Sequence, residues 1–310
     1  MLSIKHKEIF KNSIKNIISA SPRLHAVYGS YALSKQHRAL FKKIGNSTVK
    51  QSLLDRRTVT QQIRQRKEKK RSKVCHIIGS GWSLNESLKE ISPQDFVIGF
   101  NYAAISDLEF DAYFFEFGGQ KVEEISNNHL DLARVKVKNQ TDLIYFKNIW
   151  EGKNDTDFIS SHWMGLARPV MDHLYVTLDK RHLNQTLASC LNDRSEYIPQ
   201  ICSTVVTAVI LAYQAGFERI VIHGLDFGGQ YFYECMEADI DPRFLPPPKP
   251  VSGFYGKTNK ADVHPTAQAT VGMRDIVPVL HDLLDQKGVE MMCGYEHSPS
   301  SAYLPVYRKN

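Results

Sequence analysis

The chain has 310 residues, of which 42% are hydrophobic and 23% charged, a composition that supports a packed core and excludes general disorder. The longest apolar runs fall short of the roughly 18 residues that a spanning helix needs, so we expect no transmembrane segment. The net charge of +6 is unevenly spread: residues 1–73 carry +16 and residues 74–310 carry −10.

The five cysteines are odd in number and form no Cys-x-x-Cys pair. This usage indicates reduced thiols in a cytoplasmic enzyme and argues against a disulfide framework or a zinc knuckle.

Residues 1–73 form a basic region that we treat as separate from the domain after it. Residues 4–18 have the pattern of a basic amphipathic helix, and residues 61–73 are almost entirely polar and basic. Three interpretations stay open for this region: a charged helix packed on the domain, a surface for anionic lipid, or a nucleic-acid contact. Nucleic acid is the weakest of the three, because the aromatic residues that stack on single strands are missing.

A run of short apolar segments predicts the strands of a parallel sheet buried on both faces. The segments are Val74–Ile78, Phe96–Phe100, Ala112–Glu116, residues 143–146, Arg219–His223 and residues 289–293. A buried helix is predicted over residues 203–215, capped by Ser203 and ended by Gly216. Another helix is predicted after His264, with Pro265 in its first turn and its end before Gly288. Alternating strands and helices predict a doubly wound, mostly parallel Rossmann-like α/β domain over residues 74–310.

The first strand is followed at once by Gly79-Ser80-Gly81-Trp82-Ser83. Ser83 and Glu86 have the spacing of a capping box, so a helix should begin there. A strand, a glycine turn and a helix start make a unit that can hold phosphate, although the third glycine of the dinucleotide fingerprint is missing.

Ligands of open parallel sheets bind beyond the carboxyl ends of the strands, which directs attention to the polar residues there. These candidates are Ser80, Ser83, Asn101, Glu116 and Asp226, joined by Ser203 and Thr204 at a helix start. Residues 228–262 are rich in glycine, proline and tyrosine and are expected to form a lid. His264 follows the lid and is either a general base or a helix cap. Two Asp-x-Asp triplets, at residues 155–157 and 239–241, are interpreted as surface loops and not as a metal site.

These motifs, in this order, resemble the bacterial CMP-sialic acid-dependent sialyltransferases of glycosyltransferase family 42 and a related flagellar nonulosonate-transfer domain. The resemblance rests on Gly79 to Leu84, on Phe100-Asn101, on the stretch from Ser203 to Phe227, and on His264. It covers roughly residues 74–310 and leaves the basic region unmatched.

The resemblance implies a single Rossmann-like domain with a lid and an inverting transfer that needs no metal ion or other cofactor. It implies that His264 is the general base and that Tyr231 or Tyr233 donates to the leaving phosphate. The implied donor contacts are Gly79, Ser80, Gly81, Ser83, Asn101, Ser203, Thr204, Asp226 and Phe227. Glu116 stands where the family has an asparagine and is expected to contact donor or acceptor.

The sequence therefore predicts an enzyme that transfers an acidic sugar from its CMP-activated form to a glycan or glycolipid acceptor of the bacterial surface. It is expected in the cytoplasm, at the inner face of the membrane, held there by the basic region, with no nucleic-acid partner. Two alternatives stay open: a nucleotide-dependent diphosphokinase of the pterin type, and a basic binding module with a degenerate enzyme domain.

Overall fold

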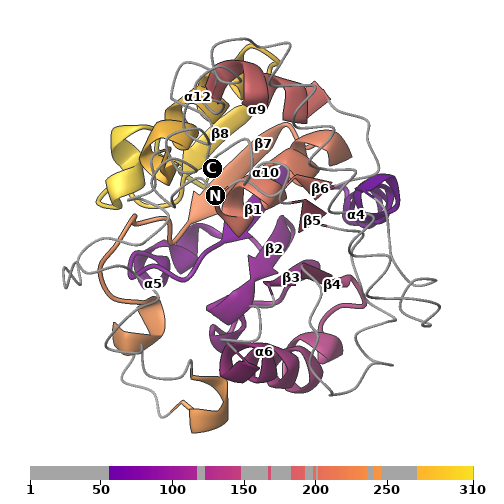
Figure 1. The fold of residues 1–310 in the computed structure, drawn as a ribbon, viewed down its shortest axis with the longest axis vertical. Helices are drawn as coiled ribbons and strands as arrows, with labels where there is room; N and C mark the ends of the chain where they lie inside the picture. Colours follow the sequence, from indigo (N-terminus) through magenta and orange to yellow (C-terminus); the bar gives the residue numbers. More distant parts are fainter. Residues whose placement is uncertain are drawn as a thin grey trace, which may run out of the picture.

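The computed structural model describes residues 56–116, 123–147, 167–168, 183–192, 198–199, 202–235, 240–245 and 271–309. A sheet of six parallel strands runs through the centre of the molecule, in the order β4-β3-β2-β1-β7-β8 (Figure 1). Its strands are β1 Val74–Ile78, β2 Phe96–Phe100, β3 Ala112–Glu116, β4 Ile144–Lys147, β7 Arg219–His223 and β8 Glu290–Cys293. A second sheet pairs β5 Ala167–Arg168 with β6 Ile198–Pro199. The predicted doubly wound α/β class is confirmed.

The strand order reverses between β1 and β7. From β1 the chain builds outward through β2, β3 and β4, and then returns to place β7 and β8 on the other side of β1. In open α/β sheets the crevice at such a reversal, beyond the carboxyl ends of the two strands, is where ligands bind. The turns that follow β1 and β7 therefore locate the candidate site.

Helices cover both faces of the sheet. One face packs against α4 Arg56–Lys70, α9 Leu183–Asn192, α10 Thr204–Ala215 and α12 Met273–Asp285. The other face packs against α6 Glu123–Val135 and the short helices η2 Asn101–Ile105, η6 Phe232–Cys235 and η7 Pro242–Phe244. In Figure 1, α6 lies beside β3 and β4, while α9 and α12 lie at the β8 end of the sheet.

Helix α10 follows the sequence prediction closely. Ser203 is its N-cap and accepts a hydrogen bond from the N–H of Val205, and Gly216 ends it in the left-handed conformation, at φ 86°. Almost every side chain of α10 is buried, because α10 is enclosed by α4, α9 and the sheet. The all-round apolar pattern of this segment is thereby explained.

Helix α4, in the basic region, packs on the α/β domain. The buried Arg56 donates to the backbone carbonyl of Cys190 and to the side chain of Gln214. Near the other end of α4, Lys67 donates to the carbonyl of Gly216, where cations are favourable beside the C-terminus of α10. At least this part of the basic region is a packed helix. The division at residue 73 stays a prediction, and residues 1–55 lie outside the described part.

One predicted helix start is confirmed without its capping box, and another is wrong. Helix α5, Leu84–Ser87, begins behind Ser83 as predicted, but it has four residues, is followed by a 3₁₀ turn, η1 Leu88–Glu90, and receives no side-chain cap from Ser83. Helix α12 begins at Met273 behind Gly272, whose N–H donates to the Asp275 carboxylate. Its predicted end before Gly288 is confirmed, and Pro265 lies outside the described residues.

No helix in the described part of the chain is long and apolar enough to span a bilayer. None of the five cysteines forms a disulfide.

Candidate functional site

The glycine turn after β1 lies directly against the turn after β7. The N–H of Gly79 donates to the carbonyl of His223 at 2.9 Å, and the N–H of Gly81 donates to the carbonyl of Gly224 at 3.0 Å. A Cβ at Gly79 would lie 2.7 Å from the Gly224 carbonyl oxygen, so only glycine permits this approach. The two turns together form one rigid backbone unit at the strand-order reversal.

Asp226 ties the two turns together through its side chain. Its carboxylate accepts the N–H of Ser83 at 2.8 Å and the hydroxyl of Ser83 at 2.6 Å. It also accepts the hydroxyl of Ser298, from the C-terminal segment, at 2.7 Å. Asp226 is buried, and these three donors compensate its carboxylate for the lost water.

Ser83 was predicted to cap a helix, and the structure uses it differently. Its hydroxyl is committed to Asp226, which comes from the far side of the reversal. A tertiary acceptor has replaced the local one, which is the physical reason why the capping box does not form.

The start of the predicted lid is attached to the glycine turn. The N–H of Phe232 donates to the carbonyl of Ser80 at 3.0 Å, and Gly81 forms an antiparallel bridge with Tyr231. The rings of Tyr231 and Tyr233 are stacked, with centroids 5.2 Å apart. Tyr231 therefore lies beside Gly81, and the buried Tyr233 is stacked on Tyr231.

The N–H groups of Gly79 and Gly81 donate to backbone carbonyls of the turn after β7, so they are not free to donate to a phosphate. Among the described residues, none accepts a hydrogen bond from the N–H or hydroxyl of Ser80, which is partly exposed. Ser80 is therefore a donor of the turn that can face a ligand.

A second polar group lies at the ends of β2 and β3. Asn101 adopts a positive φ of 49° directly after β2, and its side-chain oxygen accepts the N–H of Glu116 at 3.0 Å. The carboxylate of Glu116 accepts the hydroxyl of Thr204, in the first turn of α10, at 2.8 Å. Three predicted site residues from three separate elements thus meet at one corner of the sheet.

His129 of α6 supports this corner from below. Its Nδ1 lies 2.9 Å from the carbonyl oxygen of Glu116, and its ring packs on Tyr102 and Phe115. Burial lowers the pKa of His129 to about 4, so the ring is neutral at pH 7 and donates its Nδ1 proton to that carbonyl.

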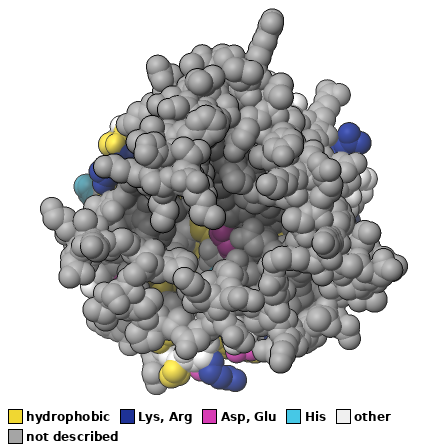
Figure 2. Space-filling model, in the orientation of Figure 1, with side chains coloured by type: hydrophobic (Ala, Val, Ile, Leu, Met, Phe, Trp, Pro, Cys, Tyr) yellow, Lys and Arg dark blue, Asp and Glu magenta, His cyan; other side chains and the backbone are white. Residues whose placement is uncertain are grey.

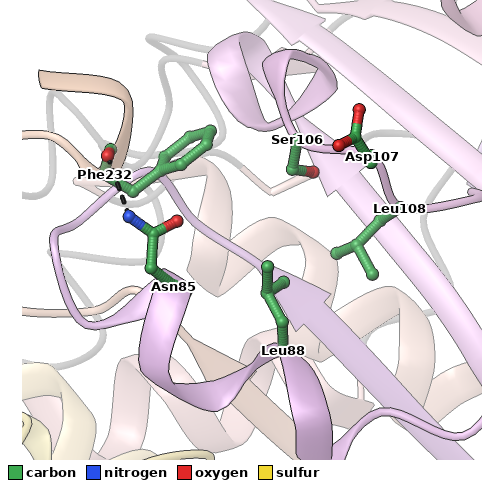
Figure 3. A pocket seen from close by; sticks show the side chains of 6 residues that line it. All are labelled: Asn85, Leu88, Ser106, Asp107, Leu108 and Phe232. Carbon is green, nitrogen blue, oxygen red and sulfur yellow. Dashed lines mark hydrogen bonds between the residues drawn. The ribbon is translucent and has the colours of Figure 1, made fainter. Parts of the chain in front are cut away.

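Figure 2 shows hydrophobic and acidic side chains near the centre of the face in view. A pocket of about 170 Å³ lies behind the start of the predicted lid and is lined by Asn85, Leu88, Ser106, Asp107, Leu108 and Phe232 (Figure 3). The side-chain amide of Asn85 donates to the carbonyl of Phe232 there and links η6 to α5.

The remaining predicted residues are placed as follows. Phe227, at a positive φ of 59°, packs between the Arg274 guanidinium and the ring of Tyr303, within the core on the α10 side. Asp241 caps η7 and pairs with Arg243. His264, the triplet at residues 155–157 and most of the lid lie outside the described residues. Within the described part, no three His, Cys, Asp or Glu side chains are grouped as a metal site.

Sequence reasoning missed Ser298, His76 and His129. Ser298 follows the end of β8 by five positions, but no local pattern connects it with Asp226, 72 positions earlier. His76 is a single histidine within an apolar strand, and His129 is a single histidine within an amphipathic helix, so neither pattern marks a functional residue.

No family model matches the chain, and no curated protein matches it. Among solved structures, the chain is similar to the α-2,3-sialyltransferase Cst-I of Campylobacter jejuni, with 15% identity over 76% of this chain and 80% of that one, at a TM-score of 0.42. It is equally similar to the sialyltransferase CstII of Campylobacter jejuni bound to the substrate analogue CMP-3FNeuAc, with 15% identity over 76% and 86% of the chains and the same TM-score. At these values the likeness concerns the order and arrangement of the secondary-structure elements alone.

Proposed function

We propose that the protein is a glycosyltransferase that moves an acidic sugar (sialic acid, another nonulosonate or Kdo) from its CMP-activated form to a glycan or glycolipid acceptor. The observation that carries the proposal is the junction of the glycine turn, Asp226 and the lid tyrosines at the strand-order reversal. This junction supplies a backbone held by hydrogen bonds, a partly exposed serine donor and two stacked phenols within one small region, which suits a nucleoside monophosphate.

In this proposal the leaving group sets the chemistry. CMP departs as a phosphate monoester, and its developing charge can be met by hydrogen bonds from Ser80 and from Tyr231 or Tyr233 without a metal ion. The anomeric carbon of such a sugar carries a carboxylate and favours an oxocarbenium-like transition state. The acceptor hydroxyl then needs a positioned base, the role we assign to His264, and attack from the opposite face inverts the anomeric centre.

The corner formed by Asn101, Glu116 and Thr204 would border the sugar. Since Glu116 carries its own negative charge, it would face the acceptor hydroxyls while Ser203 and Thr204 meet the donor. The basic region would keep the enzyme at an anionic membrane surface that carries lipid-linked acceptors.

A nucleotide screen tests the proposal directly. A ligand that binds only the native state at one hundred times its Kd stabilises that state by about 2.7 kcal/mol, which raises the melting temperature. We expect CMP to raise it more than CDP, UDP, GDP or ATP do. The Gly81→Ala variant should lose the CMP effect because its methyl group would overlap Asp226. The Ser92→Ala variant should keep it, because Ser92 precedes β2 and so lies toward the amino ends of the strands, away from the glycine turn.

A preference for ATP over CMP would refute the transferase and support the diphosphokinase. No response to any nucleotide would support the binding module. If CMP binds, release of CMP from CMP-activated acidic sugars in the presence of glycan acceptors completes the test.

A further inference from the structure

Three side chains lie in a row beneath the glycine turn. His76, in the middle of β1, has its Nδ1 2.8 Å from Nε2 of His223, the last residue of β7. On its other side, Nε2 of His76 lies 3.2 Å from the carboxylate of Asp95, the residue before β2. Both imidazole rings are buried, and the Asp95 side chain is 17% exposed.

The C-terminal segment encloses this row. The ring of Tyr307 packs edge-on against His76, with centroids 5.4 Å apart, and His223 occupies the space left by Gly294, where a Cβ would overlap its ring. The other charged groups nearby lie around Tyr307 and not against the imidazole rings. Arg219, which pairs with Glu290, lies over the ring of Tyr307. Glu90 accepts the N–H of Lys309. Among the described residues, Asp95 is the single carboxylate bonded to the pair.

The distances determine where the hydrogens lie. A carboxylate accepts hydrogen bonds, so His76 carries a proton on Nε2 and presents the lone pair of Nδ1 to His223. His223 must therefore carry its proton on Nε2. Its Nδ1 is left as a buried acceptor for which the structure shows no donor, an uncommon state that calls for an explanation.

We propose that Asp95, His76 and His223 form a buried proton-accepting chain that positions the glycine turn and releases it in acid. A proton that arrives at Nδ1 of His223 forms an N–H bond there, and the Nε2 proton of His223 passes to Nδ1 of His76. His223 ends neutral with its tautomer reversed, and His76 becomes an imidazolium beside the Asp95 carboxylate. Burial and the neighbouring His76 hold the pKa of His223 well below its usual value, so His223 does not keep the charge.

Proton uptake affects the glycine turn because His223 is part of it. The reversed tautomer places an N–H against Gly294 with no acceptor, and an unsatisfied buried donor is costly. Relief requires His223 to move, yet the carbonyl of His223 holds the N–H of Gly79 and the next carbonyl holds the N–H of Gly81. The link to the turn is independent of any ligand, whereas a consequence for CMP binding rests on the proposed function.

Nitrogen NMR of ¹⁵N-histidine protein, over pH 5 to 8, tests the chain without a ligand. Above pH 7 we expect His223 with its proton on Nε2 and His76 with a lone pair on Nδ1. In acid His76 should become doubly protonated and His223 should change tautomer. The amide signals of Gly79 and Gly81 should move with the same midpoint.

The Asp95→Asn variant keeps the shape of the partly exposed side chain but removes the charge that favours imidazolium. It should move the shared midpoint to lower pH, whereas Asp142→Asn, at an exposed carboxylate paired with Arg66, should leave it unchanged. A proton on Nδ1 of His223 at neutral pH, glycine signals that ignore the histidine midpoint, or an unmoved midpoint in Asp95→Asn would each overturn the proposal. A failure of CMP to bind at every pH would refute the proposed function alone. The NMR spectra would still test whether Asp95, His76 and His223 form a proton-accepting chain.

Discussion

Asp226 holds Ser83 by two atoms at once, the backbone N–H and the hydroxyl, across 143 positions of sequence. This double contact fastens the turn after β1 to the turn after β7 at the point where the strand order reverses. The candidate site is therefore built from the turns that follow β1 and β7, the first and fifth strands of the main sheet.

The first prediction concerns Asp226→Asn. An amide in place of the carboxylate would turn one acceptor into a donor that faces the donors of Ser83 or Ser298. Hydrogen bonds to a charged group are worth about 1.5–3 kcal/mol, so we expect the free energy of unfolding to fall by about 2–3 kcal/mol. Urea denaturation at pH 7 measures the change.

The control for Asp226 is Asp282→Asn, because Asp282 is an exposed carboxylate of α12 that lies 3.3 Å from Nδ1 of the adjacent His281. This control should change the stability by less than about 0.5 kcal/mol. Equal stabilities of the two variants would show that the Asp226 contacts contribute nothing to the junction.

The second prediction concerns His129 and acid. Its pKa falls from 6.5 to about 4 on folding, chiefly through burial, so the unfolded chain binds the proton more readily. The neutral ring therefore contributes stability that is complete above pH 6.5 and is lost as the pH falls toward 4. The loss over this interval is about 3 kcal/mol.

A His129→Asn variant retains an amide donor for the Glu116 carbonyl but does not titrate. The free energy of unfolding of the native protein should fall faster than that of the variant between pH 6.5 and 4, as measured by urea denaturation at several pH values. Parallel curves would contradict the predicted titration.

The third prediction concerns His264. If it is the general base, His264→Ala should lower kcat by roughly 10²–10⁴-fold and leave CMP affinity unchanged. If it caps a helix, the same variant should lower stability by about 1 kcal/mol with near-normal kcat. Turnover, CMP binding and melting temperature of this one variant distinguish the two roles.

The fourth prediction concerns residues 1–73. With a net charge of +16, this region should bind vesicles that contain anionic lipid, and added salt should weaken the binding. Co-sedimentation with anionic and with neutral vesicles measures it. Binding to both kinds alike, or to neither, would contradict a role at the membrane surface.

Some features of the fold could be predicted because their causes are local in the chain. The buried helix α10 carries its cap, its apolar residues and its terminal glycine within 14 consecutive positions, so both ends were predictable. The short apolar strands and the Gly-x-Gly turn could also be predicted, since burial on both faces and a tight turn each leave a local pattern in the sequence.

The sequence by itself thus determined the α/β class, the central strands and the chain segments that meet at the site. The tertiary structure decided how the polar side chains are used. Ser83 bonds to Asp226 instead of capping a helix, Glu116 meets Thr204, and His76 joins Asp95 to His223. The reason is physical: a buried donor takes the acceptor that the fold brings within about 3 Å, and nothing in the spacing of residues along the chain records which acceptor that will be.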